Sequence, residues 1–300
     1  MLLMVAALFA ACASEDIAQD KKKENGTEAP KGGVIFAANG PKASAKRLSI
    51  DGVEETAGAK TRTSFTHTPD KGADAVWTSE DFIWVQKRDG TWAKSTAIEL
   101  HDGGTSAEFT LPGSKTDYAD GCEVRYTGIS GSVPSLGKHM LVSIATNQNR
   151  SSANDFSRAG DWGDCGSGVA HNTGNPDKFN FTLSHKSSYL CFLPRCGNAA
   201  LAPNVRLMNI KITALNGGPI SGLFIFDGEN IGTGTPPVYN NIEVILLNLP
   251  PLSTTANQTA NATYLAVRPG TYDFKIEYTI KDPTTNVETV ITDIKTNITL

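Results

Sequence analysis

The sequence predicts an all-β protein made of two β-sandwich domains. Short segments in which apolar and polar residues alternate recur from residue 61 to the C-terminus, and no segment has the pattern of a long helix. Turn-forming pairs such as Asp89-Gly90 and Asp120-Gly121 separate these segments. Strands of this length and spacing are typical of a sandwich, and 300 residues are enough for two domains.

The composition excludes a disordered chain and a nucleic-acid-binding surface. Hydrophobic residues make up 39% of the chain, which is enough to bury a core. The 27 basic and 31 acidic residues form no basic cluster of the kind that binds phosphates, so we expect no nucleic-acid partner. The one basic run, at residues 21–23, is interpreted as part of a solvated tether.

The N-terminus predicts export as a lipoprotein. Residues 1–11 are apolar but much shorter than the ~20 residues that a membrane-spanning helix needs. They end in Leu8, Phe9, Ala10 and Ala11 before Cys12, which resembles a bacterial lipobox. We therefore expect a signal peptide at 1–11, a lipid on Cys12 and a flexible polar leader at 12–32. The alternative is that residues 1–11 form a segment of the core.

The first predicted strand is a short apolar run with structure breakers on both sides. It consists of Val34, Ile35, Phe36, Ala37 and Ala38. Glycines precede it, and Asn39, Gly40 and Pro41 follow it, so the run is typical of a single strand. Alternation places Val34, Phe36 and Ala38 on one side of this strand.

The connection that follows the first strand is the expected site of proteolytic processing. Residues 41–60 are rich in Ala, Gly, Lys and Glu, and we expect them to be exposed and accessible to a protease. Cleavage after Arg47 would remove the leader together with the strand at 34–38. Arg62 is the alternative cleavage position, but it lies at the start of a predicted strand.

The N-terminal half contains further predicted strands and then a polar gap. The strands are expected at 63–67, 75–85, 108–111, 123–127 and 140–145. Residues 147–177 are polar and rich in glycine, and we interpret them as a long loop that leads to the domain junction. The expected domains are therefore 33–177 and 178–300.

The C-terminal half contains the clearest strand patterns of the chain. Strands are expected at 179–183, 189–193, 205–214, 220–226, 242–247, 264–267 and 272–280. The final segment alternates as well, with one face made of Val290, Thr292, Ile294, Thr296, Ile298 and Leu300. This segment is either a strand that is donated to another subunit or the last strand of its own sandwich.

The cysteines favour disulfide or core roles over a metal site. A lipid on Cys12 would leave Cys122, Cys165, Cys191 and Cys196, which allow three pairings in an oxidising compartment. Cys191 and Cys196 are the nearest pair and the first candidate disulfide. His185 precedes them, but the spacing fits no standard zinc pattern, so we expect neither a metal nor a cofactor.

The sequence predicts no enzyme. Residues 163–168 around Cys165 resemble the nucleophile turn of cysteine peptidases with the chymotrypsin fold, and His67, His101 and His139 lie upstream. None of these histidines has the sequence context of that family, however, and no other catalytic motif is present. A peptidase that uses Cys165 is a remote alternative.

A glycan-binding surface lipoprotein is another alternative. Trp77, Trp84 and Trp92 lie close together in the sequence, and aromatic platforms bind sugars. Trp77 shares its alternation phase with Ile83 and Val85, which favours the core, whereas Trp84 points to the other side.

Several short patterns together resemble the fimbrillin family, the lipoprotein precursors of surface fimbriae in anaerobic Gram-negative bacteria. The matching residues are the lipobox at Cys12, the strand at 34–38, the run 61–63, the W-x-x-x-D-x-I-x-V string at 77–85, the F-x-F-x-x-x-H run at 179–185 and Pro269-Gly270-x-Tyr272-x-Phe274. Their order spans nearly the whole chain.

The resemblance implies a structural subunit of adhesive fimbriae (pili). The expected fold is two tandem transthyretin-like Greek-key β-sandwiches, carried on a lipid anchor in the outer membrane until an Arg-directed protease removes the first strand. The implied partners are other fimbrial subunits, the processing protease, the outer membrane, and host protein or glycan receptors. An anchor or tip subunit that keeps its lipid and leader is the alternative within the family.

Strand exchange also follows from the physical chemistry of the first strand. Removing a strand leaves unpaired backbone groups and an apolar slot, both of which are unfavourable in water. A strand from another chain would restore the main-chain hydrogen bonds. Because such head-to-tail contacts do not close on themselves, an open filament is expected.

Overall fold

The computed structural model describes most of the chain from Gly33 onward. The described residues are 33–38, 46–48, 54–56, 64–68, 72–128, 139–150, 152–155, 157–175, 177–247, 250–282 and 284–300. For 46–48, 54–56, 64–68 and 72–75 only the backbone is described. The expected signal peptide at 1–11, the leader at 12–32, Cys12 and Arg62 lie outside the described residues.

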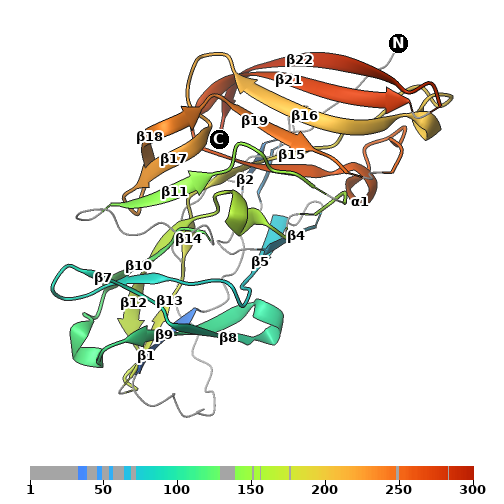
Figure 1. Cartoon of the computed structure of the whole chain (residues 1–300). Coiled ribbons are helices and arrows are strands. Elements are labelled where there is room, and N and C mark those ends of the chain that lie inside the picture. Colours follow the sequence, from blue (N-terminus) through green and yellow to red (C-terminus); the bar gives the residue numbers. More distant parts are fainter. Residues whose placement is uncertain are drawn as a thin grey trace.

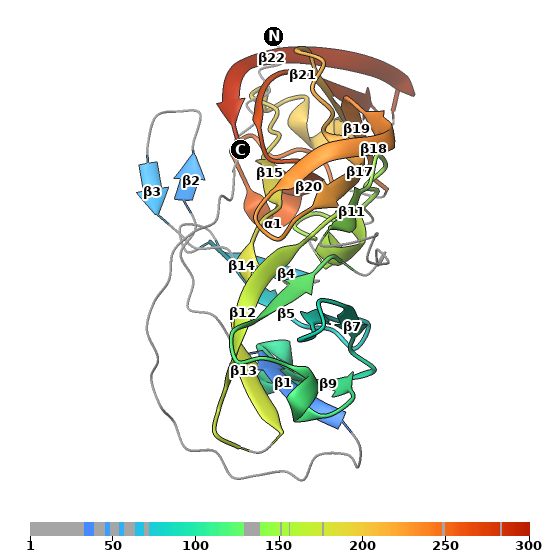
Figure 2. The ribbon, with the colours of Figure 1, turned by 90° about the vertical axis from the view of Figure 1, so that its left-hand side faces the viewer.

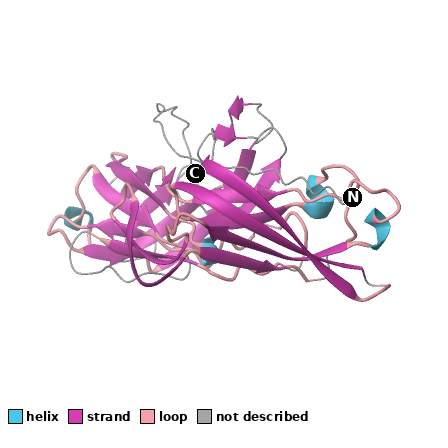
Figure 3. Ribbon diagram, turned by 90° about the horizontal axis from the view of Figure 1, so that it is seen from above, coloured by secondary structure: helices cyan, strands magenta, loops and turns pink. Residues whose placement is uncertain are grey.

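Strands dominate the described chain, which confirms the prediction of an all-β protein (Figure 3). The helical elements there are short: η1 Asp102–Gly104, η2 Lys115–Asp117, η3 Ala159–Trp162, η4 Ala202–Asn204 and α1 Gln258–Asn261. Within the described ranges, no helix has the length and apolar character needed to cross a membrane.

The first half of the molecule is one nine-stranded sheet, in the lower part of Figure 1. Its strand order is β7-β6-β10-β12-β13-β1-β9-β8, and β14 pairs with β12 beside this path. The strands are β1 Gly33–Ala38, β6 Trp84–Gln86, β7 Trp92–Lys94, β8 Ala97–His101, β9 Ser106–Pro112, β10 Cys122–Tyr126, β12 Gly166–Asn172, β13 Lys178–Phe181 and β14 Ser184–His185.

This sheet curls so that its two ends meet. The terminal strands β7 and β8 follow each other in the chain, separated by Ser95 and Thr96 alone, and the Thr96 N–H donates to the Thr110 carbonyl of β9 at 2.8 Å. The curled sheet encloses a core to which Phe36, Phe109 and Phe179 contribute. Curling therefore buries one face of nearly every strand and leaves few exposed edges.

The second half, in the upper part of Figure 1, is built from three smaller sheets. Their strand orders are β11-β17-β18, β15-β20 and β19-β16-β21-β22. The strands are β11 Met140–Ile144, β15 Ser188–Phe192, β16 Arg206–Ala214, β17 Ser221–Phe226, β18 Ile231–Tyr239, β19 Asn241–Ile245, β20 Thr263–Val267, β21 Thr271–Asp282 and β22 Val287–Thr299.

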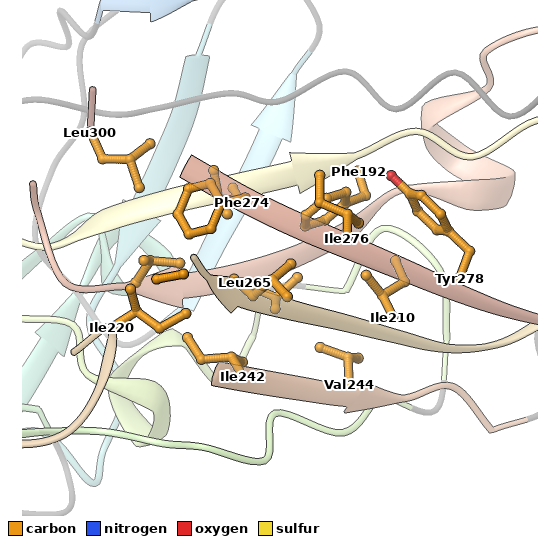
Figure 4. Packing of buried hydrophobic residues seen from close by; sticks show 14 of the residues in the cluster. Phe192, Ile210, Ile220, Ile242, Val244, Leu265, Phe274, Ile276, Tyr278 and Leu300 are labelled. Carbon is orange, nitrogen blue, oxygen red and sulfur yellow. The ribbon is translucent and has the colours of Figure 1, made fainter. Parts of the chain in front are cut away.

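The core of the second half lies between these sheets (Figure 4). Ile210, Ile276 and Val244 from the four-stranded sheet belong to the same buried cluster as Phe192 and Leu265 from the β15-β20 pair. The alternation predicted for 272–280 is confirmed, because every second residue of β21 is buried. This half is a β-sandwich.

Two hairpins stand apart from these sheets. Among the described strands, β2 Lys46–Leu48 pairs only with β3 Glu54–Thr56, and β4 Ser64–Thr68 pairs only with β5 Gly72–Val76. Figure 2 draws the β2–β3 hairpin to the left of the second half. The predicted connection at 41–60 thus contains a small antiparallel pair.

The segment predicted as one strand at 75–85 is two strands with a turn between them. β5 ends at Val76 and β6 begins at Trp84. The Asp81 N–H donates to the Thr78 carbonyl at 3.2 Å, and the Thr78 N–H donates to the Asp81 carboxylate at 2.7 Å. Asp81 thus closes a local turn that competes with an extended chain.

The prediction of a long loop at 147–177 is wrong, because this segment contains η3 and the central strand β12. The sequence of β12 is rich in glycine and lacks the apolar alternation of a strand. The reason is close packing: a Cβ at Gly168 would lie 2.0 Å from the Thr182 carbonyl oxygen. Backbone contact at this point leaves room for glycine alone. Strand β18, which is rich in Gly and Pro, is likewise missed.

The sheets do not separate at residue 177. β11 pairs with β17 in the second half, and the chain then returns to the first half for β12, β13 and β14. β13 begins at Lys178, so the expected boundary between 33–177 and 178–300 does not coincide with a division between sheets.

A buried arginine joins the two halves. Arg125 on β10 is ion-paired with Glu123 at 2.6 Å and donates to the carbonyls of Asp227 at 2.5 Å and Phe226 at 3.3 Å, at the end of β17. Ser167 on β12 donates to the carbonyl of Gly228 in the same turn. Because a buried guanidinium needs its donors satisfied, this turn is held firmly against the first half.

We expect Gly168→Ala to lower the free energy of unfolding by at least ~2 kcal/mol, because the new methyl group meets backbone rather than a movable side chain. Urea denaturation measures the change. Gly232→Ala on β18 is the matched control, since its Cβ would lie at an ordinary 3.6 Å from the Ile225 carbonyl. Equal losses in the two variants would contradict the packing explanation.

Candidate strand-exchange site

The strand at 34–38 lies in the interior of the first sheet, as β1. It pairs antiparallel with β9 and parallel with β13, so hydrogen-bonding partners flank it on both sides. The five residues predicted for it are all buried, including Ile35 and Ala37, which are each only 8% exposed. The prediction of one strand with Val34, Phe36 and Ala38 facing a core is confirmed.

Phe36 is the largest apolar contribution of β1 to this core. Its ring stacks on Phe179 of β13 with 4.7 Å between centroids, and it meets the edge of Tyr118 at 5.2 Å. Aromatic pairs of this geometry add to the free energy gained from burial alone. β1 is therefore held by side-chain packing as well as by its two backbone ladders.

An ion pair crosses the outer face of β1. Lys178 on β13 is the register partner of Ile35, and Glu108 on β9 is the partner of Ala37. The Lys178 Nζ lies 2.5 Å from a Glu108 carboxylate oxygen, so the pair spans the strand between them. Because both groups are partly exposed, the pair adds only modest stability. Sequence reasoning missed it, since nothing in the sequence gives the register of β1 against β9 and β13.

Loss of β1 would open a slot between β9 and β13. The backbone groups of both neighbours would lose their partners, and Phe179 and Tyr118 would lose the ring that they contact. Each buried, unpaired backbone group is unfavourable by about 1–3 kcal/mol. A replacement strand would restore these main-chain hydrogen bonds.

The candidate cleavage residue Arg47 lies on β2, where it is the register partner of Glu55 on β3. Only the backbone of this hairpin is described. A two-stranded pair without further strands is marginally stable in water. Opening this hairpin locally therefore requires little free energy, and proteases cleave segments that can open in this way.

The candidate donor segment forms β22, the outermost strand of its own sandwich. It pairs along its length with β21, from Val287 opposite Asp282 to Thr299 opposite Thr271. The alternative, in which this segment is the last strand of its own domain, therefore describes its place in this structure. Its second edge carries no partner in the described chain.

The expected continuous apolar face of this segment is interrupted by a bulge. The register shifts between Tyr272 and Phe274, and Asn297 on β22 adopts a positive φ of 56°. After the bulge, Ile298 and Leu300 face the core, but before it the core side is taken by Ile291, Asp293 and Lys295. The prediction that Val290, Thr292, Ile294, Thr296, Ile298 and Leu300 share one face is wrong, because the bulge reverses the alternation after Thr296.

The reversed alternation leaves aliphatic side chains of β22 in solvent. Val290 is 57% exposed and Ile294 is 49% exposed, on the outer face of an edge strand. On the core side, Asp293 and Lys295 form an ion pair at 3.1 Å, and inward-pointing charges of this kind protect an edge from unwanted pairing. In the first part of β22, aliphatic side chains thus face solvent and charged side chains face the core.

The opposite edge of the same sheet is covered. The backbone of 146–150 runs beside β19, where Gln148 N–H donates to the Glu243 carbonyl at 2.9 Å and Arg150 N–H to the Ile245 carbonyl at 3.0 Å. Within the described residues, β22 is thus the open edge of this sandwich and β19 the closed one.

The candidate disulfide between Cys191 and Cys196 is not formed. Among the described residues no cysteine is disulfide-bonded. Cys191 belongs to a small cluster with Trp162 and Tyr264, whereas Cys196 belongs to the main core of the second half. The two side chains thus serve two separate packing groups.

Cys165 lacks the properties of a catalytic thiol. Its side chain is fully buried, and burial raises the pKa of the thiol far above its usual value, which disfavours the nucleophilic thiolate. Its Sγ contacts the Ser187 hydroxyl at 3.2 Å. The neighbouring His185 lies 3.0 Å from Asp164, which also accepts from the Tyr189 hydroxyl at 2.7 Å, in a fully buried group.

The tryptophans do not form an exposed platform. Trp77 packs in the first core with Ile83 and Val85, as predicted. Trp84 is only 9% exposed and packs with Phe82 and Met140, with Trp92 against the same group. Trp84 points away from the first core, as predicted, but it is buried there, so the glycan-binding alternative lacks an exposed indole at this position.

Asp81 is a buried ionisable group within the segment predicted as a strand at 75–85. Besides Thr78, it accepts from the Tyr126 hydroxyl at 2.8 Å, in a buried position. Burial raises the pKa of this carboxyl to about 7. A strand pattern cannot reveal this, because the burying residues come from distant segments.

We expect Phe36→Ala to lower the free energy of unfolding by ~3–5 kcal/mol, since it removes a fully buried ring and leaves a cavity. Chemical denaturation measures the loss. Val169→Ala, a truncation of a half-exposed side chain on β12, should change stability by less than ~0.5 kcal/mol. A small effect at Phe36 would show that β1 is not held by its packing.

Asp81→Asn should change how stability depends on pH. The folded chain holds the Asp81 proton up to about pH 7, whereas the carboxyl of the unfolded chain loses it near the ordinary aspartate pKa of 3.8. The contribution of Asp81 is therefore complete below this lower pKa and is lost as the pH rises to 7. Over this interval, the free energy of unfolding of the variant should rise by up to ~4 kcal/mol relative to that of the wild type. Asp89→Asn, at an exposed turn, should show no such rise.

Comparison of the chain with models of known protein families, with curated proteins and with solved structures finds no match.

Proposed function

We propose that the chain is a structural subunit of surface fimbriae that polymerises by β-strand exchange and supports adhesion. In this proposal the protein resembles fimbrillins: two tandem transthyretin-like sandwiches, exported as a lipoprotein with its lipid on Cys12 and held in the outer membrane until processing. Cleavage after Arg47 removes β1, and a strand of another subunit fills the slot.

The observation that carries the proposal is the position of β1. It is the first described strand of the chain, yet it lies between β9 and β13 in the interior of a sheet and is buried throughout. Arg47 follows it, on the separate β2–β3 hairpin. One cut there would detach an interior strand while the other eight strands of the sheet stay linked through the chain.

β22 is the best candidate for the incoming strand. At its present edge it pairs on one side only, whereas a strand in the slot would pair with both β9 and β13. Each additional hydrogen bond contributes about 0.5–1.5 kcal/mol net. Moving β22 loses its ladder with β21 and the burial of Leu300, so the second ladder and newly buried aliphatic groups must offset that loss.

The exposed residues Val290 and Ile294 supply the apolar burial that the slot requires. A strand without the bulge at Asn297 would present Val290, Ile294 and Ile298 on one face. With Thr292 and Thr296 between the aliphatic residues, that face has the same every-second-residue alternation as Val34, Phe36 and Ala38, which occupy this position in the uncut chain. The mismatch of β22 with its own sandwich is thereby explained.

The experiment is treatment of the full chain with an Arg-specific protease, followed by N-terminal sequencing and size-exclusion chromatography. We expect a new N-terminus at Leu48 and a ladder of polymers. Ile294→Asp should abolish the polymers without changing monomer stability, because this side chain is half-exposed in the monomer. Leu247→Asp is the matched control, an aliphatic residue of similar exposure beside the covered edge, and should polymerise normally.

Two outcomes would contradict the proposal. A trimmed chain that stays monomeric at high concentration would show that the slot does not accept a strand. A mature surface protein that starts at a lipidated Cys12 and keeps β1 would instead favour an anchor or tip subunit.

A further inference from the structure

Three metal-ligating side chains meet on the outer face of the β8–β9 hairpin. Glu99 on β8 lies directly opposite Glu108 on β9 in the antiparallel register, and His101 follows Glu99 by two positions on the same face. One potential ligand atom from each of the three lies within 4.8 Å of the others. The alternate residues Ala107, Phe109 and Leu111 face the core, so this triad faces outward.

Without a metal ion, the arrangement is unfavourable apart from the ion pair between Lys178 and Glu108. Two carboxylates directly across a ladder repel each other. In addition, the Nε2 atom of His101 is shielded from solvent and has no hydrogen-bond partner among the described residues. A shielded nitrogen without a partner is unfavourable by about 1–3 kcal/mol. A bound cation would offset the carboxylate repulsion, and an imidazole that acts as its ligand would gain a partner.

We propose that Glu99, His101 and Glu108 form a binding site for a divalent transition-metal ion, with zinc as the best fit. Two carboxylate oxygens and one imidazole nitrogen form a three-ligand set of the kind that zinc binds with water in the fourth position. Magnesium and calcium prefer sets made only of oxygen, so the imidazole selects against them. The site adjoins the strand slot, because Glu108 lies on β9 opposite Ala37 of β1, but none of its three ligands comes from β1 and it does not depend on the proposed polymerisation.

The scaffold presents these ligands with little reorganisation. Glu99, His101 and Glu108 lie on two paired strands, and the short helix η1 follows His101 directly. The Thr105 N–H and hydroxyl both bond to the Asp102 carbonyl at this turn, which keeps the hairpin closed. Ligands on paired strands need less ordering than ligands on loops.

Lys178 competes with a metal for Glu108. Its ammonium lies 2.5 Å from one Glu108 oxygen, and this positive charge lowers the affinity for a cation at the same carboxylate. Removing the Lys178 charge should therefore raise the affinity for zinc, whereas removing a ligand should lower it.

The test is isothermal titration of zinc chloride into the full chain, followed by the same titration of variants. We expect one site, weakened more than ~10-fold by His101→Ala and by Glu99→Gln, since loss of an outer-shell partner alone has effects of this size. Lys178→Met should strengthen binding. His171→Ala is the matched control: His171 lies 3.5 Å from Asp120 at an exposed position outside the triad and should leave affinity unchanged.

The result that would overturn the proposal is zinc binding that His101→Ala leaves unchanged, or no zinc binding to the unaltered chain. Equal affinity for calcium and zinc would also overturn it, because a site without the imidazole would behave in that way. Thermal melts with and without zinc provide a second readout: zinc should raise the Tm of the unaltered chain but not that of His101→Ala.

Discussion

The double pairing of β1 is the constraint on which the rest of the structure depends. Its backbone forms one ladder with β9 and another with β13. Among the described strands, β1 is therefore the link in the strand order between β13 and its neighbours on one side and β9 and β8 on the other. The stacked rings of Phe36 and Phe179 and the Lys178–Glu108 ion pair reinforce both contacts. An interior strand cannot be lost and leave its neighbours as they were, because their backbone groups then need new partners.

The second half of the molecule contains an edge strand that is paired on one side, in contrast to the interior strand β1 of the first half. Its four-stranded sheet is closed at β19 by the segment 146–150 but open at β22, where aliphatic side chains face solvent. Arg125 and the turn after β17 hold the two halves together. In the proposed polymer, loss of β1 leaves a fillable position in one half and β22 is the open edge strand of the other, so subunits would join head to tail, as a filament requires.

Regular alternation was predictable from the sequence, and departures from it were not. The strand at 34–38 follows from an apolar run between structure breakers and most strands of the second half follow from period-two patterns, and the structure contains them. β12 escaped prediction because Gly168 is required by a backbone contact with Thr182, which comes from a later segment. The face of β22 was misjudged because the bulge at Asn297 is set by pairing with β21. The opposition of Glu99 and Glu108 likewise needs the register of β8 and β9, which no residue pattern reveals.

The parallel pairing of β1 with β13 also has a consequence for biosynthesis. β1 leaves the ribosome first among the described strands, but β13 is made only after β12, late in the synthesis of the sheet. Contacts between residues so distant in sequence form slowly, because closing a long loop is entropically unfavourable. The nascent protein therefore passes through a stage in which β1 has emerged but one of its two neighbours does not yet exist. The first strand therefore lacks its second partner during part of synthesis, before any proteolytic processing.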